Sequence, residues 1–461
     1  MKEEEKRRYT GEDFAPVYPL WLLFPITLLF LVILLWFKLV YRLKIIRDPE
    51  LEKLPPGPAV YLGNHCSMLD FFFMSIAFYP RRIHYVMSNA FLSKWWGPPV
   101  IRGLQQIPKS QFFAEAKSVI TMKRAVKKGC SIGIYPEGRI SLTGRTGYIA
   151  PAIGKLVKSF EVPVIAVKEE GFSLRKPLWS KIRRRGDLQV ECRLLFTHQE
   201  IQDLTAEEIH RRIVEALDYN DNERQLRKGL PFGKSRRLFG RAKLAEGLEL
   251  ILHRCPSCGR ELVMESSGNR LFCGECGFGV TLDEYNRLTP ERGGWPGESL
   301  TSIPDWHDWQ AGVMRRRLAA PGYSFSSPGR LTLLAKNSFR AEEGGPVKVC
   351  LDAAGIWLEK DGVREKAHQT GEPGPGYWPA EQKETEAAGD RGADEDKVIR
   401  YFSAGQLPTV TGTLGCFVDF PGVDTLYRPE FNDRRLPVFW MQAVEALYAG
   451  KAENGAKGCP G

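Results

Sequence analysis

A long apolar segment near the N-terminus constrains the fold more than any other feature. No charged residue occurs from Phe14 to Phe37, and Leu, Phe and Ile are frequent there. As a helix the segment would reach roughly 36 Å, enough to cross a bilayer. A secretory signal has a shorter apolar core, about 7–15 residues, and then a small-residue cleavage site. Here Lys38 and Arg42 follow instead, so we expect residues 1–47 to form a membrane anchor.

Pro25 lies inside this segment. The helix is therefore expected either to span the membrane with a kink or to re-enter on the same side. Basic residues flank both ends almost equally and do not decide the orientation. The chain has 65 Lys and Arg against 55 Asp and Glu, a formal charge of +10. That modest surplus suits a membrane surface, an anionic substrate or nucleic acid.

The 461 residues predict two to four domains. Residues 48–220 alternate between short apolar runs and helical stretches, which predicts an α/β fold around a largely parallel or mixed sheet. The expected strands are 59–63, 131–135, 162–167 and 189–196, and the expected helices are 68–78, 114–127 and 150–159. Thr205 and Glu208 form a capping-box pattern that predicts a further helix.

The remaining chain divides by composition. Residues 221–249 are a basic linker or helix, and residues 250–290 contain two cysteine pairs. Residues 300–450 contain a helix at 305–318, short strand candidates at 331–334, 347–351 and 415–420, and a closing helix that starts near Pro437. We expect a β-rich C-terminal domain, and a disordered loop at about 368–397, where Gly, Pro and acidic residues gather.

The string Asn64-His65-Cys66-Ser67-Met68-Leu69-Asp70 carries the sharpest chemical signal. With His65 in a turn and Asp70 in the first turn of the following helix, the two side chains can meet. An imidazole can then take a proton from an alcohol, while the carboxylate holds the other ring nitrogen. The pair suits acyl transfer by general-base catalysis, with direct attack of the acceptor hydroxyl.

Two alternatives remain for this string. Ser67 to Asp70 also matches a capping box before an apolar helix, with His65 an incidental turn residue. Cys66 is a further candidate for a nucleophile, although an apolar cysteine in a loop is more often a packing residue.

A second polar string follows an expected strand about 70 residues later. Ile134-Tyr-Pro-Glu-Gly-Arg-Ile-Ser141 places Glu137, Gly138 and Arg139 in one turn. Loops at strand ends build sites in α/β sheets. Arg139 suits binding of a phosphate, and Glu137 suits positioning of a hydroxyl or of the arginine.

Together these strings resemble the glycerolipid acyltransferase family, which includes glycerol-3-phosphate and 1-acylglycerol-3-phosphate O-acyltransferases. The first matches the family's Asn-His-x-Ser-x-x-Asp block, and the second is similar to its Phe-Pro-Glu-Gly-Thr-Arg-Ser block. Between and after them, 103–109 and 162–167 fall where the family has two further blocks. Order and spacing agree over residues 56–200.

The resemblance implies that His65 is the general base and Asp70 its partner. It also implies substrate binding by Glu137, Gly138 and Arg139, with Lys109 as a further candidate for phosphate. The sequence departs from the family pattern at several positions. These are Arg139 for Thr, Ile140 for Arg, Pro108 for Asp and Lys109 for Arg. A lysine is a point charge and not a bidentate fork.

Two cysteine pairs point to a metal. Cys255, Cys258, Cys273 and Cys276 form two Cys-x-x-Cys-Gly knuckles, whose thiolates can close a tetrahedron around a structural Zn²⁺. Two disulfides or free thiols are the alternatives. The segment resembles a zinc ribbon, a module that often binds nucleic acid or protein. Zinc thiolates favour a reducing compartment, so we expect the catalytic domain on the cytoplasmic side of the membrane.

Two basic clusters lie outside these motifs. One surrounds Trp179 with residues Arg175, Lys176, Lys181, Arg183, Arg184 and Arg185. The other runs from Arg224 to Lys243 around Phe232, Leu238 and Phe239. They are either solvated faces or contacts for anionic lipid head groups. Nucleic acid is the less favoured partner for a chain tied to a bilayer.

We therefore expect a membrane-bound O-acyltransferase that transfers a fatty acyl group from a coenzyme A or acyl-carrier-protein thioester to a lysophospholipid. The simplest acceptor is 1-acyl-sn-glycerol 3-phosphate, which would give phosphatidic acid. An acceptor without phosphate is one alternative. The other is a membrane-tethered adaptor, in which the zinc ribbon recruits a partner and the acyltransferase domain is vestigial. The C-terminal strands also faintly resemble a pleckstrin-homology or GRAM-type barrel.

Overall fold

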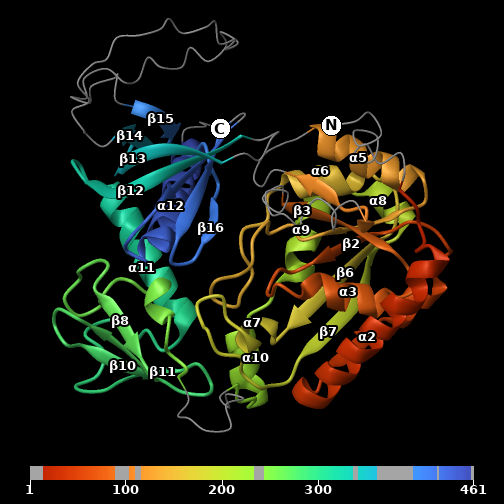
Figure 1. Cartoon of the computed structure of the whole chain (residues 1–461), viewed down its shortest axis with the longest axis horizontal. Coiled ribbons are helices and arrows are strands. Elements are labelled where there is room, and N and C mark those ends of the chain that lie inside the picture. The colour runs from red at the N-terminus through yellow and green to blue at the C-terminus, as the bar shows by residue number, and fades with distance from the viewer. Residues whose placement is uncertain are drawn as a thin grey trace, which may run out of the picture.

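The computed structural model describes residues 14–88, 103–109, 116–232, 243–335, 341–360, 398–422 and 425–457. Figure 1 shows an α/β half beside a C-terminal half that contains two antiparallel sheets. The predicted disordered loop at 368–397 lies outside the described residues, as does half of the second basic cluster, residues 233–242.

The α/β half is built on a seven-stranded mixed sheet, as expected, with the order β1-β7-β6-β2-β5-β3-β4. All neighbouring pairs are parallel except β6 and β7, which are antiparallel. The strands are β1 (Lys44–Arg47), β2 (Val60–Gly63), β3 (Ile83–Ser88), β4 (Ile107–Lys109), β5 (Ser131–Ile134), β6 (Val164–Glu170) and β7 (Gln189–Phe196).

Helices cover both faces of this sheet. They are α3 (Asp70–Phe78), α5 (Ala116–Lys127), α6 (Ala152–Lys158), α7 (Phe172–Arg175), α8 (His198–Asp203), α9 (Ala206–Leu217) and α10 (Asp221–Lys228), with the 3₁₀ helix η1 at Pro49–Lys53. Residues of β6 alternate between two apolar clusters: Val164 and Ala166 face one, and Ile165 and Val167 face the other. This period of two is why the strand reads as a continuous apolar run.

Local capping explains where some of the helices begin. Thr205 and Glu208 form the predicted capping box at the start of α9. Helix α3, by contrast, starts at Asp70, two residues later than predicted. Ser67 Oγ accepts from the amide of Leu69 at 3.1 Å, and no side chain caps the helix. The capping-box alternative is therefore only half formed, since Asp70 does accept the amide of Ser67.

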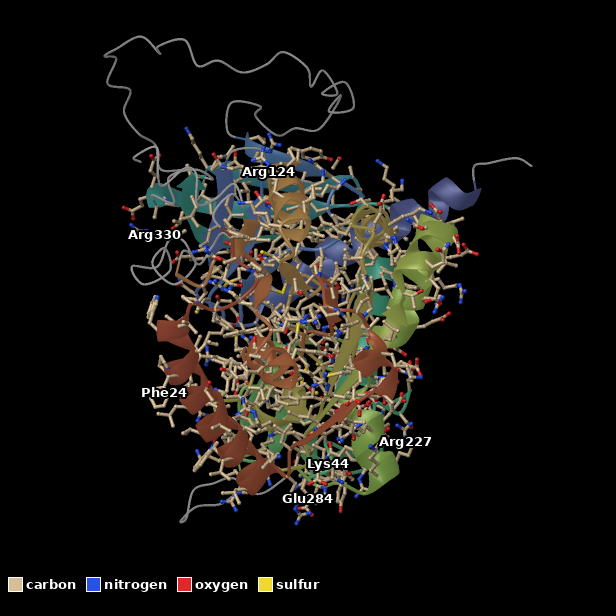
Figure 2. The ribbon with its side chains drawn as sticks, turned by 90° about the vertical axis from the view of Figure 1, so that its right-hand side faces the viewer. Phe24, Lys44, Arg124, Arg227, Glu284 and Arg330 are labelled. Carbon is tan, nitrogen blue, oxygen red and sulfur yellow. The ribbon has the colours of Figure 1, made fainter. Side chains whose placement is uncertain are left out.

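The N-terminal apolar segment forms α2 (Leu20–Tyr41), a helix long and apolar enough to cross a membrane. Pro25 sits inside it, and the helix continues through the proline. Figure 1 shows α2 along the edge of the α/β half. One side packs inward, where the ring of Phe37 lies 4.7 Å from that of Phe73 on α3. The other side is exposed, and Figure 2 shows Phe24 on it pointing away from the protein.

The cysteine pairs lie on a small antiparallel sheet of order β11-β10-β9-β8. Its strands are β8 (Met264–Ser267), β9 (Arg270–Cys273), β10 (Gly279–Leu282) and β11 (Leu288–Pro290), preceded by the 3₁₀ helix η3 at Leu248–Leu250. Cys255 and Cys258 precede β8, Cys273 ends β9, and Cys276 lies in the turn between β9 and β10.

The third sheet is antiparallel, with the order β15-β14-β13-β12-β18-β17-β16. Its strands are β12 (Ser324–Ala335), β13 (Ala341–Asp352), β14 (Gly355–Lys360), β15 (Val398–Ser403), β16 (Thr411–Thr413), β17 (Phe417–Pro421) and β18 (Thr425–Glu430). The helices α11 (Ile303–Leu318) and α12 (Leu436–Lys457) accompany it. The expected β-rich region with a closing helix is thus confirmed, and its likeness to a pleckstrin-homology or GRAM barrel stays a prediction.

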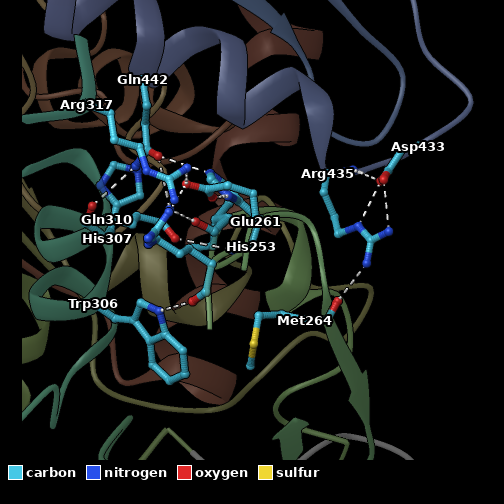
Figure 3. A network of polar contacts seen from close by, with 12 residues as sticks. His253, Glu261, Met264, Trp306, His307, Gln310, Arg317, Asp433, Arg435 and Gln442 are labelled. Atoms are coloured by element: carbon cyan, nitrogen blue, oxygen red, sulfur yellow. Dashed lines mark hydrogen bonds and ion pairs between the residues drawn. The ribbon is translucent and has the colours of Figure 1, made fainter. Parts of the chain in front are cut away.

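A buried polar network ties α12 to the cysteine module (Figure 3). His253 Nε2 and Gln310 Nε2 lie 3.1 and 3.2 Å from Gln442 Oε1. Gln442 Nε2 in turn donates to the carbonyl of His307, and Trp306 Nε1 donates to that of Arg254. Because unpaired polar groups are costly inside a protein, this network fixes the orientation of α12 against α11.

The first basic cluster is only partly exposed. Arg175, Trp179 and Arg184 are buried, so the prediction that they face lipid is wrong. The guanidinium of Arg175 lies over the ring of Phe37 at 5.3 Å. Arg184 donates to Asn286 Oδ1 and the carbonyl of Leu244, and burial lowers its pKa to about 9. These arginines join segments of the protein instead.

The prediction of lipid contact is also wrong for two described residues of the second cluster. Arg224 is buried and pairs with Glu170 at 3.0 Å, and Phe232 is also buried. Among the described residues of the two clusters, the exposed basic ones are Lys176, Lys181, Arg183, Arg185, Arg227, Lys228 and Lys243. These remain candidates for contact with anionic lipid.

Close packing of α6 on α9 gives a test of this fold. A Cβ on Gly154 would lie 2.0 Å from the carbonyl oxygen of Ala206. We expect Gly154→Ala to lower the free energy of unfolding by about 1–3 kcal/mol, because backbone cannot yield as a side chain does. Gly450→Ala, with open space around its Cβ, is the control. Equal thermal midpoints for the two variants would contradict this packing.

Candidate active site

The candidate site lies where three neighbouring parallel strands end. His65 follows β2, Glu137 and Arg139 follow β5, and Glu169 lies at the end of β6. Carboxyl ends of parallel strands meet at one edge of a sheet, which is where α/β proteins place their sites. The first two strings of the sequence are therefore brought together.

Asn64 fastens the loop after β2 to strand β6. Its side-chain amide donates to the carbonyl of Glu169 at 2.8 Å, and its oxygen accepts from the amide of Glu169 at 2.6 Å. Both groups are buried. Two reciprocal hydrogen bonds of this kind hold the loop, and with it His65, at a defined place on the sheet.

Asp70 collects three donors on one carboxylate oxygen. His65 Nδ1 lies 2.9 Å from Oδ2, and the backbone amides of Cys66 and Ser67 donate to the same atom at 2.8 and 2.9 Å. The carboxylate is 1% exposed. Such an arrangement holds the carboxylate rigidly and sets the orientation of the imidazole.

The other ring nitrogen of His65 faces outward. The ring stacks on Tyr135, with centroids 4.7 Å apart, and its side chain is 24% exposed. No hydrogen-bond partner for Nε2 occurs among the residues that the structure describes. This nitrogen is therefore available to a substrate proton.

Gly63 makes the stacking possible. A Cβ on this residue would lie 2.6 Å from the ring of Tyr135 and 2.8 Å from the methyl group of Met74. Only a glycine at the end of β2 leaves room for the tyrosine beneath His65.

Glu137 holds the backbone around His65. Its Oε1 accepts from the amide of His65 at 2.7 Å, and its Oε2 accepts from that of Gly147, also at 2.7 Å. Burial raises its pKa to about 7, against the lowering effect of these two amides. Both oxygens are thus engaged in the protein, and the predicted contact of Glu137 with a substrate stays a prediction.

Arg139 lies in the same loop and meets the C-terminal half. Gly138 before it adopts a positive φ of 69°, which turns the chain. The amide of Ser141 then donates to the carbonyl of His65 at 2.8 Å. Arg139 Nη2 lies 2.5 Å from Glu445 Oε1 on α12, a contact that the sequence did not predict.

Lys109 is placed apart from this group. It ends β4, the edge strand, which β3 and β5 separate from β2. With about 4.8 Å between strands, its backbone lies about 14 Å from that of β2. The structure thus does not bring Lys109 to His65, and its binding of phosphate stays a prediction.

Cys66 is built into the protein interior. The thiol is buried, with Sγ 3.6 Å from the carbonyl of Glu169 and 3.8 Å from Asp70 Oδ1. Burial, with Asp70 nearby, raises its pKa well above the usual value. A buried neutral thiol is a packing residue and not a nucleophile.

Glu169 is the site residue that sequence reasoning missed. It is fully buried, and its carboxylate lies within 4.8 Å of Asp70 and of the Cys66 sulfur. Burial, and then the charge of Asp70, raise its pKa well above the usual value. Neither of its oxygens has a hydrogen-bond partner among the described residues, so a protonated Glu169 would bring an unused donor close to Asp70. The alternation of residues along β6 could have revealed it, since Glu169 lies on the same buried face of the strand as Ile165 and Val167.

The four cysteine sulfurs gather as a metal site requires. Cys255 Sγ lies 3.6 Å from Cys276 Sγ, Cys258 Sγ lies 3.8 Å from Cys273 Sγ, and all four are within 4.8 Å of one another. Zinc–sulfur bonds of about 2.3 Å give tetrahedral edges of about 3.8 Å. Backbone amides of Ser257, Cys258 and Cys276 also point at sulfurs. The residues present therefore fit Zn²⁺.

Comparison with known proteins identifies the class of the α/β half. Residues 46–168 match the family model described as Acyltransferase. They include the whole His65–Asp70 string and the Glu137–Arg139 turn. The chain therefore carries an acyltransferase domain.

Two known proteins are similar to this chain. The chain is 27% identical over 190 residues to the chloroplastic 1-acyl-sn-glycerol-3-phosphate acyltransferase BAT2 of Brassica napus, covering 36% of this chain and 49% of that protein. It thus spans about half the length of this curated relative. The crystal structure of the 1-acyl-sn-glycerophosphate acyltransferase PlsC from Thermotoga maritima matches 50% of this chain and 84% of that one, at 15% identity and a TM-score of 0.36.

Glu169 can be tested by two substitutions. Glu169→Gln keeps a neutral donor beside Asp70, and we expect acyltransferase activity within about threefold of the native protein. Glu169→Leu removes the donor and should lower activity about 10-fold or more, as for loss of a hydrogen bond to a charged group, ~1.5–3 kcal/mol. Equal losses in the two variants, or none in the leucine variant, would contradict this role.

The same residue predicts how stability depends on pH. A carboxyl with a raised pKa keeps its proton in the native state while the unfolded chain loses it above about pH 4.5. Stability should therefore fall as pH rises from there toward the native pKa. In Glu169→Gln this contribution disappears, so unfolding free energies measured over that range should decline less steeply.

Proposed function

We propose that the protein is a membrane-bound O-acyltransferase that moves a fatty acyl group from an acyl thioester to the hydroxyl of a lysophospholipid. The simplest acceptor is 1-acyl-sn-glycerol 3-phosphate, with phosphatidic acid as the product. One observation carries this proposal: His65 Nδ1 is held by the buried Asp70, while Nε2 is left available. The named activities of the two relatives support the choice of substrate class.

His65 acts as general base in this mechanism. Its Nε2 takes the proton of the acceptor hydroxyl while that oxygen attacks the thioester carbonyl carbon. The resulting imidazolium is stabilised by Asp70 through the Nδ1–H bond. Since the two backbone amides already hold the carboxylate, little reorganisation is needed as charge develops on the ring.

Collapse of the tetrahedral intermediate breaks the carbon–sulfur bond. The thiolate of coenzyme A or of an acyl carrier protein leaves and takes up the proton from His65 Nε2, which restores the neutral imidazole. No acyl-enzyme forms, because the attacking oxygen belongs to the acceptor. The burial of Cys66 supports this route over a covalent one.

The loop after β5 is the proposed acceptor side. Gly138 and Arg139 lie between Glu137 and Ser141, both bonded to the backbone of His65. A guanidinium there can bind a phosphate. We assign Glu137 to positioning this loop and Arg139 to the acceptor, and Lys109 remains a weaker candidate for phosphate.

The exposed side of α2 is the proposed membrane contact. Large apolar side chains cover it, including Leu20, Trp21, Phe24, Leu28 and Leu31. A patch of this kind on one helix suits the hydrocarbon of a bilayer better than water. The reducing environment that zinc thiolates require favours the cytoplasmic side for the rest of the chain.

We also propose that the cysteine module binds one structural Zn²⁺. Four thiolates occupy every position of a tetrahedral ion, so the metal would stabilise the fold and take no part in catalysis. We further propose that the chain divides into an anchor at 1–47, an acyltransferase domain at 48–220, a linker at 221–249, a zinc module at 250–290 and a C-terminal domain at 300–450. The polar network of His253, Gln310 and Gln442 links the last two.

The base is tested by substitution. His65→Ala should lower kcat by about 10²–10⁴-fold in a thioester-consumption assay with lysophosphatidic acid, because general-base assistance is lost. Cys66→Ala, a neighbour that the mechanism does not use, is the control and should stay within a few fold of the native rate. Native turnover by the His65 variant would refute the mechanism.

Metal content tests the cysteine module. The purified chain should hold one zinc ion, and Cys258→Ser should lose it with a fall in the thermal midpoint, because binding energy is folding energy in such modules. Cys416→Ser, an exposed cysteine outside the cluster, is the control and should keep the metal. Zinc in equal amount in both variants would contradict the assignment.

A further inference from the structure

The C-terminal half places a carboxylate on the arginine assigned to the acceptor. Glu445, on α12, lies 2.5 Å from Arg139 Nη2 through its Oε1. The same oxygen accepts from Thr409 Oγ1 at 2.8 Å, which steadies the carboxylate in this position. The two residues are far apart in the sequence, so the contact exists only because the two halves fold against each other.

The contact belongs to a wider interface. Arg145 forms an ion pair with Asp308 on α11, and the hydroxyls of Tyr148 and Tyr448 lie 3.5 Å apart. Leu142 packs against apolar clusters of the C-terminal half. The loop from Glu137 to Tyr148, which carries the acceptor side, is thus covered by α11 and α12.

Arg139 is held by only one of its two terminal nitrogens. Nη2 binds Glu445, whereas Nη1 is buried and has no hydrogen-bond partner among the described residues. A guanidinium satisfies both nitrogens best with two oxygens of one anion. The carboxylate of Glu445 therefore leaves a donor unused that a larger anion can engage.

A phosphomonoester is the anion that fits. It carries a charge of about −1.5 to −2 at neutral pH and three acceptor oxygens, against one charge on a carboxylate. Glu445 is about a third exposed and Arg139 about a fifth, so an entering head group can reach the pair, and Nη1 becomes accessible when the carboxylate moves aside. An exchange of carboxylate for phosphate on Arg139 is thus favoured both by charge and by the unused Nη1.

We propose that Glu445 is a specificity-determining residue that competes with the acceptor's phosphate group for Arg139. Without an acceptor, Glu445 neutralises the arginine and α12 closes this side of the site. A lysophospholipid with a terminal phosphate displaces the carboxylate, whereas an acceptor without phosphate has nothing to exchange for it. This inference rests on the proposed function.

The test compares Glu445→Gln with the native chain, with lysophosphatidic acid and with a monoacylglycerol as acceptors. The glutamine keeps the shape and removes the charge. We expect KM for lysophosphatidic acid to fall about two- to fivefold, the range of a partly exposed ion pair, with kcat and the monoacylglycerol reaction unchanged. Asp308→Asn breaks the neighbouring pair with Arg145 and should leave KM unaltered.

A double substitution separates competition from a general loosening of the interface. In an Arg139→Gln background, Glu445→Gln should give no further fall in KM, since the shared partner is gone. An unchanged or raised KM in the single Glu445 variant would overturn the inference. So would an equal fall in the Asp308 variant, or a fall that persists without Arg139.

Binding of glycerol 3-phosphate can be measured from the rise in thermal midpoint that it causes, a readout that needs no turnover. It should be stronger in Glu445→Gln than in the native chain, and equal binding would overturn the inference. The proposed function fails separately, if the native chain and His65→Ala consume thioester at the same rate.

Discussion

The site depends on one carboxylate oxygen. Asp70 Oδ2 receives His65 Nδ1 and two backbone amides, and α3 begins at this residue. The aspartate therefore shapes the loop, starts the helix and orients the imidazole at once. Because it is buried, its position is set by the sheet and by Asn64, which ties the loop to β6. The hydrogen bonds that fold the loop are therefore the same ones that would set the proposed catalytic geometry.

Two other buried carboxyl groups, those of Glu137 and Glu169, lie around the His65–Asp70 pair. Glu137 holds the amide of His65 from one side, and Glu169 lies beside Asp70 from β6. Three carboxyl groups at one strand edge cannot all carry charge cheaply in a buried place. Burial raises the pKa values of Glu137 and Glu169, and both carboxyl groups lie close to the Asp70–His65 pair.

The sequence predicted features that depend on neighbouring residues, but not contacts between segments that are far apart along the chain. The strand at 189–196, the capping box at Thr205 and the meeting of His65 with Asp70 follow from periodicity or from a few adjacent residues. Glu169 and the Arg139–Glu445 pair require knowledge of which strands and halves adjoin. Arg175 and Arg184 illustrate the same limit, since a basic run reads as surface until its partners, here aromatic rings and carbonyls, are known.

Helix α3 joins the site to the apolar helix α2. Its first residue, Asp70, holds the imidazole of His65, while Phe73, one turn along, packs on Phe37 of α2. The outward side of α2 is apolar, and Figure 2 shows Phe24 at its edge. If that side rests in lipid, rigid packing sets the depth at which His65 stands relative to the bilayer surface. A lipid hydroxyl would then be selected by its height in the membrane as well as by its chemistry.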